Sequence, residues 1–152
     1  MKKVLGLAMV LGLVLLTGVA FAADTNTLTV QANIVGTCKF STATSTLNFG
    51  ALDPSSASDA SASTTVNFWC TKNASYTVTD NNGSNYLAPN RRMKDAGTDY
   101  IPYGLTYSPA TGSGSGKTTP ITLTLTGTVV NANYVNAPVG NYSDTVILSI
   151  AP

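Results

Sequence analysis

The chain contains no histidine and no glutamate, so all seven of its acidic residues are aspartates. Histidine and glutamate are the most frequent general acids and bases, and histidine is also the commonest metal ligand. The closest aspartate pair, Asp95 and Asp99, fits a solvated loop. No nucleophile elbow marks a reactive serine, and no ordered base stands beside Lys72 or Lys94. We therefore predict that the protein is not an enzyme and has no catalytic residue, metal site or cofactor.

Charge is also scarce, with eight basic residues against seven acidic ones in the whole chain. Loss of Lys2 and Lys3 with a cleaved N-terminus would leave six basic residues. Nucleic acids and anionic lipids are bound mainly by clustered lysine and arginine. The near-neutral balance therefore predicts neither a nucleic-acid partner nor attachment to a charged membrane surface.

The N-terminus has the three parts of a secretion signal. Met1-Lys2-Lys3 is a short basic start, residues 4–19 are almost entirely apolar, and Ala20-Phe21-Ala22 is a typical cleavage site. The apolar run of about 16 residues is shorter than the roughly 20 that a membrane-spanning helix needs. We therefore predict that residues 1–22 are a signal peptide, that the exported chain keeps 130 of the 152 residues, and that it does not insert stably into a membrane.

Cysteine occurs only at Cys38 and Cys70. An even count in an exported chain indicates a disulfide, and neither a close CxxC spacing nor further ligands support a redox or metal role. Closing a loop of about 33 residues stabilises a fold by roughly 3 to 4 kcal/mol in the chain-entropy model.

The rest of the chain lacks a convincing helical period and shows repeated alternation of apolar and polar residues. Such alternation is typical of strands with one buried face, and it occurs at residues 64–70, 74–80, 101–107, 121–126 and 145–150. Pro102 predicts an edge or bulge, and Gly127 a bulge or bend. Between the strands we predict loops, at residues 53–63, 81–84 and 108–117. Short strands with one disulfide favour an immunoglobulin-like β-sandwich, with a closed barrel as the alternative.

A further alternating segment, residues 27–35, precedes the first cysteine. Leu28, Val30, Ala32 and Ile34 share one face, and the intervening residues are polar. In an immunoglobulin-like order the sandwich would run out of sequence after Val146, Leu148 and Ile150, one strand short. The resulting apolar groove would need a strand from elsewhere. Either residues 27–35 are the molecule's own first strand, or they are donated to the groove of a neighbouring copy.

The order and spacing of several short motifs resemble the spore coat protein U family, which includes pilins of archaic chaperone-usher pili. Besides the signal peptide and the first cysteine, the residues that carry the resemblance are Leu47-Asn48-Phe49-Gly50, Val66-x-Phe68-x-Cys70-Thr71, Arg92-Met93, Ile101-x-Tyr103-x-Leu105-x-Tyr107 and Gly140-Asn141-Tyr142-Ser143-Asp144-Thr145-Val146. The resemblance covers almost the whole exported chain.

The resemblance implies an incomplete immunoglobulin-like sandwich that lacks its last strand. It divides the chain into a signal peptide (1–22), an N-terminal donor-strand extension (23–36) and a pilin-type domain (37–152). The donor strand would run from about Thr25 to Ile34. The implied partners are neighbouring copies of the subunit, a periplasmic chaperone and an outer-membrane usher. The implied location is a fimbria on the cell surface, reached through the periplasm, where the fibre would support adhesion and biofilm formation.

Two other points stay open at this stage. Tyr142, two residues before Asp144, is interpreted as a structural tyrosine whose hydroxyl ties down the preceding loop. The alternatives to a pilus subunit are a spore-coat or extracellular-matrix protein, and a carbohydrate-binding adhesin module. The adhesin would use exposed aromatic residues, for which the candidates are Trp69, Tyr100, Tyr103 and Tyr107.

Overall fold

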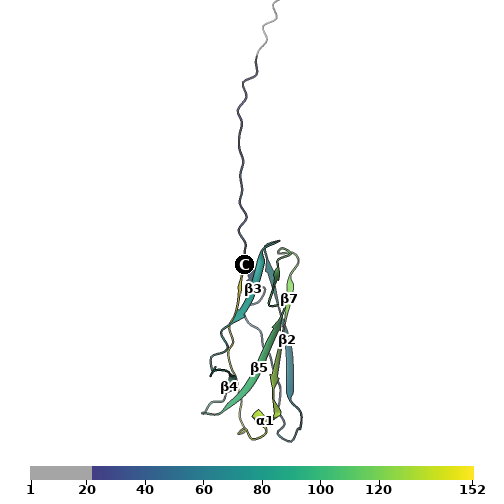
Figure 1. The fold of residues 1–152 in the computed structure, drawn as a ribbon, viewed down its shortest axis with the longest axis vertical. Helices are drawn as coiled ribbons and strands as arrows, with labels where there is room; N and C mark the ends of the chain where they lie inside the picture. The colour runs from purple at the N-terminus through teal and green to yellow at the C-terminus, as the bar shows by residue number, and fades with distance from the viewer. Residues whose placement is uncertain (1–21) are drawn as a thin grey trace, which may run out of the picture. The chain divides into compact units, whose positions relative to one another are not determined.

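The computed structural model describes residues 22–152, so the predicted signal peptide lies outside the described residues except for Ala22. The described chain divides into two units, one ending at Asn33 and the other spanning Ile34–Pro152. The larger unit is an all-β domain with one short helix (Figure 1). Its elements are β1 (Cys38–Phe40), β2 (Ala60–Cys70), β3 (Ser75–Asp80), β4 (Arg91–Lys94), β5 (Tyr100–Ser108), β6 (Thr111–Ser113), β7 (Ile121–Val129), α1 (Asn131–Tyr134) and β8 (Leu148–Ala151).

The strands form two antiparallel sheets, not a closed barrel. One sheet has the order β1-β2-β7-β5-β4, and the other has the order β6-β3-β8. The longest ladder joins β2 to β7 from Ala60 opposite Val129 to Phe68 opposite Ile121. In Figure 1 these strands run along the domain, and α1 lies at the end far from the C-terminus. None of the described helices is long and apolar enough to cross a membrane.

The hydrophobic core lies between the two sheets. Phe68 and Leu123 of the larger sheet are fully buried and belong to the same cluster as Tyr76 and Val78 of the smaller sheet. The Phe68 ring packs edge-on against Tyr76, with centroids 5.0 Å apart. A second cluster, around Ile101, Val129 and Tyr134, fills the end of the domain near α1.

The alternation of apolar residues predicts five strands, and a strand overlaps each predicted range. The last one, β8, begins only at Leu148, and β6 (Thr111–Ser113) lies within the predicted loop over residues 108–117. Pro102 lies opposite Arg92 in the ladder between β4 and β5, but the side of β5 that faces β7 is unpaired before Gly104, so Pro102 occupies a local edge as predicted. The turn at residues 81–84 is present, and it contains Asn82 and Gly83 with positive φ angles of 65° and 96°. Gly83 is also required sterically, because a Cβ there would lie 2.1 Å from Asp144 Oδ2.

The predicted loop over residues 53–63 is wrong at its C-terminal end, where β2 begins at Ala60. Small residues continue the alternation there, with Ala60 and Ala62 half-buried and Ser61 and Ser63 exposed. The serine hydroxyls donate to the carbonyls of Gly127 and Leu125 across the ladder, at 3.3 and 3.1 Å. Cross-strand bonding thus makes a strand of a stretch whose composition is typical of a loop.

The predicted bend at Gly127 is also wrong, because β7 continues regularly through it to Val129. The absence of a side chain at Gly127 instead allows close packing of Phe49 and Leu47. A Cβ at Gly127 would lie 2.6 Å from Phe49 Cζ and 2.8 Å from Leu47 Cδ2. Gly127 therefore lets the segment that carries Leu47 and Phe49 sit directly on the sheet.

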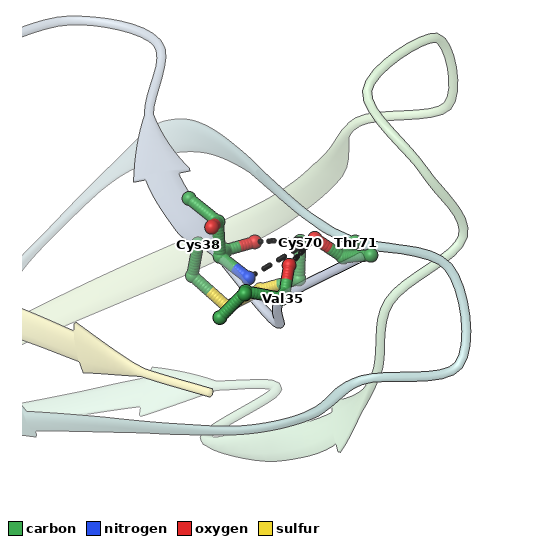
Figure 2. Close-up of a disulfide and its surroundings, with 5 residues drawn as sticks. Val35, Cys38, Cys70 and Thr71 are labelled. Carbon is green, nitrogen blue, oxygen red and sulfur yellow. Dashed lines mark hydrogen bonds between the residues drawn. A yellow bond between two sulfur atoms is a disulfide. The ribbon is translucent and has the colours of Figure 1, made fainter. Parts of the chain in front are cut away.

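The disulfide prediction is confirmed, since Cys38 is bonded to Cys70. The two cysteines are opposite each other in the β1–β2 register, so the bond ties the first strand of the domain to the end of the second. Figure 2 shows this bond, with Val35 and Thr71 next to it.

The N-terminal unit is described by itself. Residues 22–33 carry no strand assignment, and the same holds for residues 34–37 at the start of the domain. The large apolar side chains of this stretch are mostly exposed, at 84% for Leu28 and Ile34 and 83% for Val30. Ala32 is exposed as well. In the described residues, these four apolar side chains in alternating positions are thus exposed.

Candidate functional site

An open groove lies between two segments, residues 45–52 and residues 138–148, the second of which leads into β8 at Leu148. It consists of two adjoining depressions of about 550 and 350 Å³ that share Leu47, Phe49, Met93 and Tyr142 in their linings. We call it the edge groove. Its floor is mainly apolar and is formed by Ile101, Tyr103, Leu105, Leu125 and Tyr134.

The first wall of the edge groove is the segment after β1. Leu47, Phe49 and Leu52 are half-buried and point inward, whereas Asn48 and Gly50 are exposed. Among the residues that the structure describes, positions 42–52 make no backbone-to-backbone hydrogen bond. Apart from the Gly50 N–H, which donates to Asn48 Oδ1 at 2.9 Å, the backbone polar groups of this wall have no hydrogen-bond partner in the described residues, and the wall is held by side-chain packing.

The second wall, residues 142–148, leads into β8. Ser143 exchanges two backbone hydrogen bonds with Lys94, at 2.8 and 2.9 Å, while Thr145 O accepts from Ser84 N at 3.0 Å and Ile147 O from Asn81 N at 3.2 Å. In the described part of the chain, Asp144 and Val146 make no backbone hydrogen bond. Because backbone groups alternate sides along an extended segment, those of the even-numbered residues face the groove.

A polar cluster braces this second wall. The Tyr103 hydroxyl donates to Asp144 Oδ2 at 2.8 Å, and both the backbone N–H and the side-chain amide of Asn85 donate to Asp144 Oδ1 at 3.1 Å. Burial, followed by the hydrogen bond to Asp144, raises the pKa of Tyr103 well above its usual range. Asp144 thus connects the wall to the floor and to the turn at residues 81–85.

An ion pair fixes the same turn to β4. Arg91 Nη2 donates to both carboxylate oxygens of Asp80, at 2.8 and 2.9 Å, and also to Asn82 Oδ1 at 3.1 Å. Burial acts to raise the pKa of Asp80, but hydrogen bonds from Arg91 and from the Asn82 N–H lower it overall. Side-chain hydrogen bonds of the turn and of β4 therefore hold the second wall in place, although the backbone groups of Asp144 and Val146 are unpaired in the described residues.

Of the residues predicted from the sequence, those of the last strand and Tyr142 lie at or near the groove, and most of the candidate donor residues lie in the N-terminal unit. Val146 and Leu148 are half-buried and line the edge groove, whereas Ile150 packs against the main core. Tyr142 lines both parts of the groove, and its hydroxyl donates to Pro138 O at 2.9 Å in the preceding loop. The candidate donor residues Leu28, Val30 and Ala32 lie in the N-terminal unit, and Ile34 is the first residue of the domain.

The aromatic residues considered for carbohydrate binding do not form one exposed platform. Tyr103 lies in the floor of the groove, and Tyr107 packs against the main core. Trp69 lies near the end of β2, and Tyr100 at the start of β5 is covered by Arg92, whose guanidinium carbon is 4.2 Å from the ring centroid. This arrangement does not favour the adhesin alternative.

Sequence reasoning missed the first wall as part of the site. Leu47 and Phe49 were noted only as part of a family motif, although their spacing by two residues is the usual signal of an inward-facing extended segment. The hydrogen bond between Tyr103 and Asp144 could not be predicted from the sequence pattern, because the two residues are 41 positions apart. The described residues contain no group of three or more potential metal ligands.

The fold and the groove together define a class of domain: a two-sheet β-domain with an open groove along one edge. The sequence model of the Spore Coat Protein U domain matches residues 24–149. The chain therefore belongs to the Spore Coat Protein U domain family. No curated protein matches the chain.

Among solved structures, the chain is similar to a chain in the crystal structure of the CsuC–CsuE chaperone–tip adhesion subunit pre-assembly complex from archaic chaperone-usher Csu pili of Acinetobacter baumannii. The TM-score is 0.52 and the sequence identity 22%, and the match covers 77% of this chain and 40% of the other. This likeness concerns the fold. The present chain spans less than half the length of that solved chain.

Proposed function

We propose that this chain is a structural subunit of an archaic chaperone-usher pilus. It is exported to the periplasm and polymerised on the cell surface by donor-strand exchange, and the fibre supports adhesion and biofilm formation. One observation carries the proposal. A groove with an apolar floor and two unpaired backbone edges occurs in the same chain as an exposed segment whose apolar side chains alternate.

The segment and the groove match in chemistry and in length. An inserted strand satisfies the unpaired N–H and C=O groups of both walls while its alternate side chains enter the groove. Residues 28–34 span about 23 Å when extended, and the wall formed by residues 45–52 spans about 26 Å. Burial of Leu28, Val30 and Ile34 contributes roughly 1.5 to 3 kcal/mol for each side chain. These contributions give a joint that does not dissociate readily.

Because donor and groove are different surfaces of one chain, the contact between two copies is head-to-tail and propagates into a fibre. We propose residues 23–36 as the donor extension and residues 37–152 as the accepting domain. Before assembly, an empty apolar groove invites aggregation. A periplasmic chaperone prevents this aggregation by covering the groove. An outer-membrane usher then replaces the chaperone with the donor strand of the next subunit. The solved relative is itself a chaperone–subunit complex.

The test is to express the full chain with and without the archaic chaperone and usher of its own genome, and to examine cells by electron microscopy. We expect thin filaments only when both are present, because the unprotected groove leads to aggregation or degradation. Filaments formed without either protein would instead support the coat or matrix alternative. A soluble monomer in the presence of both would contradict both functions.

A further inference from the structure

The Thr71 side chain forms hydrogen bonds with the residues that lead from the N-terminal segment into the domain. Its hydroxyl oxygen accepts a hydrogen bond from the Thr37 N–H at 3.0 Å. The hydroxyl hydrogen is within reach of two carbonyl oxygens, Val35 O and Thr37 O, each at 3.3 Å. Thr37 O already accepts the Thr71 backbone N–H at 2.8 Å. The hydroxyl can therefore donate to Val35 O, a contact that Figure 2 shows beside the disulfide.

These contacts extend the anchored part of the chain by two residues. The disulfide fixes Cys38, and the backbone bond from Thr71 fixes Thr37. Among the described residues, the Thr71 side chain is the group that hydrogen-bonds further back, to Val35. Gly36, between Val35 and Thr37, lies beside Pro152 and Ala74, since a Cβ there would make ordinary contacts with their Cβ atoms at 3.4 and 3.6 Å. The chain is thus attached to its own domain from Val35 onward.

We propose that Thr71 is a positioning residue that fixes the direction in which the donor segment leaves its own domain, and so sets the stiffness of the fibre. This inference rests on the proposed function. The last candidate donor residue, Ile34, directly precedes Val35. When Ile34 is inserted into one domain and Val35 is bound to the next, no free residue lies between the two domains. Consecutive subunits are then coupled without slack, and the fibre bends little at each junction.

The test compares fibres of the wild type with those of Thr71→Val and Thr71→Ser, by measuring persistence length on electron micrographs. Valine keeps the shape and loses the hydroxyl, whereas serine keeps the hydroxyl. Each lost hydrogen bond makes the open linker on the order of 2- to 10-fold more populated. We expect a clearly shorter persistence length for Thr71→Val and a nearly normal one for Thr71→Ser. The temperature at which fibres dissociate should be equal in all three, because the inserted donor residues are unchanged.

A second variant covers the case in which Thr71→Val fails to fold. Insertion of Gly-Ser between Ile34 and Val35 leaves the Thr71 contacts intact and adds slack to the linker, so it should also give flexible fibres. Equal persistence lengths for the wild type, Thr71→Val and the insertion would overturn the positioning role while leaving the pilus function in place. Flexible fibres from Thr71→Ser would overturn the role of the hydroxyl. Failure of the wild type to form fibres would instead overturn the proposed function.

Discussion

A chain that lacks residues 23–34 is expected to bind the chaperone normally and to be absent from the shaft of the fibre. Its domain keeps the disulfide, both walls of the edge groove and the whole core, so the groove still accepts a strand. It has no apolar segment to donate to the next copy. Electron microscopy should show no fibres from this variant alone, and co-purification should show a wild-type amount of chaperone complex.

The matched control removes only residues 23–26, which precede the first apolar donor residue, Leu28. This shorter deletion should give fibres in normal yield. Fibres of normal length from the chain that lacks residues 23–34 would contradict the donor role of the segment. Loss of the chaperone complex from that chain would show that the segment is needed before assembly, which the account does not predict.

The second large effect is expected from Val30→Asp. In the assembled fibre this change places a carboxylate in an apolar groove and removes a buried valine. Even a neutral polar group buried without a hydrogen bond costs roughly 2 to 7 kcal/mol and an ionised carboxylate costs more, while the lost burial adds about 1.5 to 3 kcal/mol. Fibres of this variant should dissociate at a much lower temperature and at a lower detergent concentration, as measured by gel electrophoresis of heated samples.

Thr29→Asp provides the control, because it adds the same charge to the adjacent position, on the polar face of the donor segment. It should leave fibre dissociation nearly unchanged. Neither change should alter the melting of the chaperone-bound subunit, since Val30 is 83% exposed in the single chain. Equal effects of the two substitutions on fibre dissociation would show that the apolar face of the segment is not buried.

The strands of this fold were largely predictable because alternation is a local property. Val66 and Phe68 on β2, and Leu123 and Leu125 on β7, lie two residues apart and are all buried. A period of two therefore located these strands directly. The same reasoning failed at residues 60–63, where alanine and serine carry little hydrophobic contrast and the ladder to β7 determines the structure.

The edge groove was less predictable because it is made by contacts between distant residues. The sequence around Gly127 predicted a bend, whereas the glycine makes room for Leu47 and Phe49, about 80 residues earlier in the chain. Asp144 likewise gains its role from Tyr103 and Asn85. The expectation that a strand was missing came from counting strands and from the family resemblance. The segments that form the two walls could be identified only from the three-dimensional structure.

The groove also accounts for the dependence on partners that the proposed function requires. Val146 and Leu148 are only half-buried, and the backbone groups of Asp144 and Val146 lack partners in the described chain. Completing these contacts with a chain segment gains apolar burial and hydrogen bonds together. Tyr103 and Asn85 donate hydrogen bonds to Asp144 and so hold the second wall in position. An incoming strand would therefore pair with an ordered edge.

The central claim is that residues 28–34 of one copy occupy the edge groove of another. It is tested most directly by mixing two variants during assembly that each keep the Cys38–Cys70 disulfide and carry one added cysteine, Val30→Cys in one chain and Leu148→Cys in the other, under mild oxidation. The account predicts a new disulfide between the two chains, which is necessarily intermolecular because each carries one added cysteine. Absence of that link, together with an internal link in a monomer that carries both substitutions, would show that the segment fills its own groove and would contradict the account.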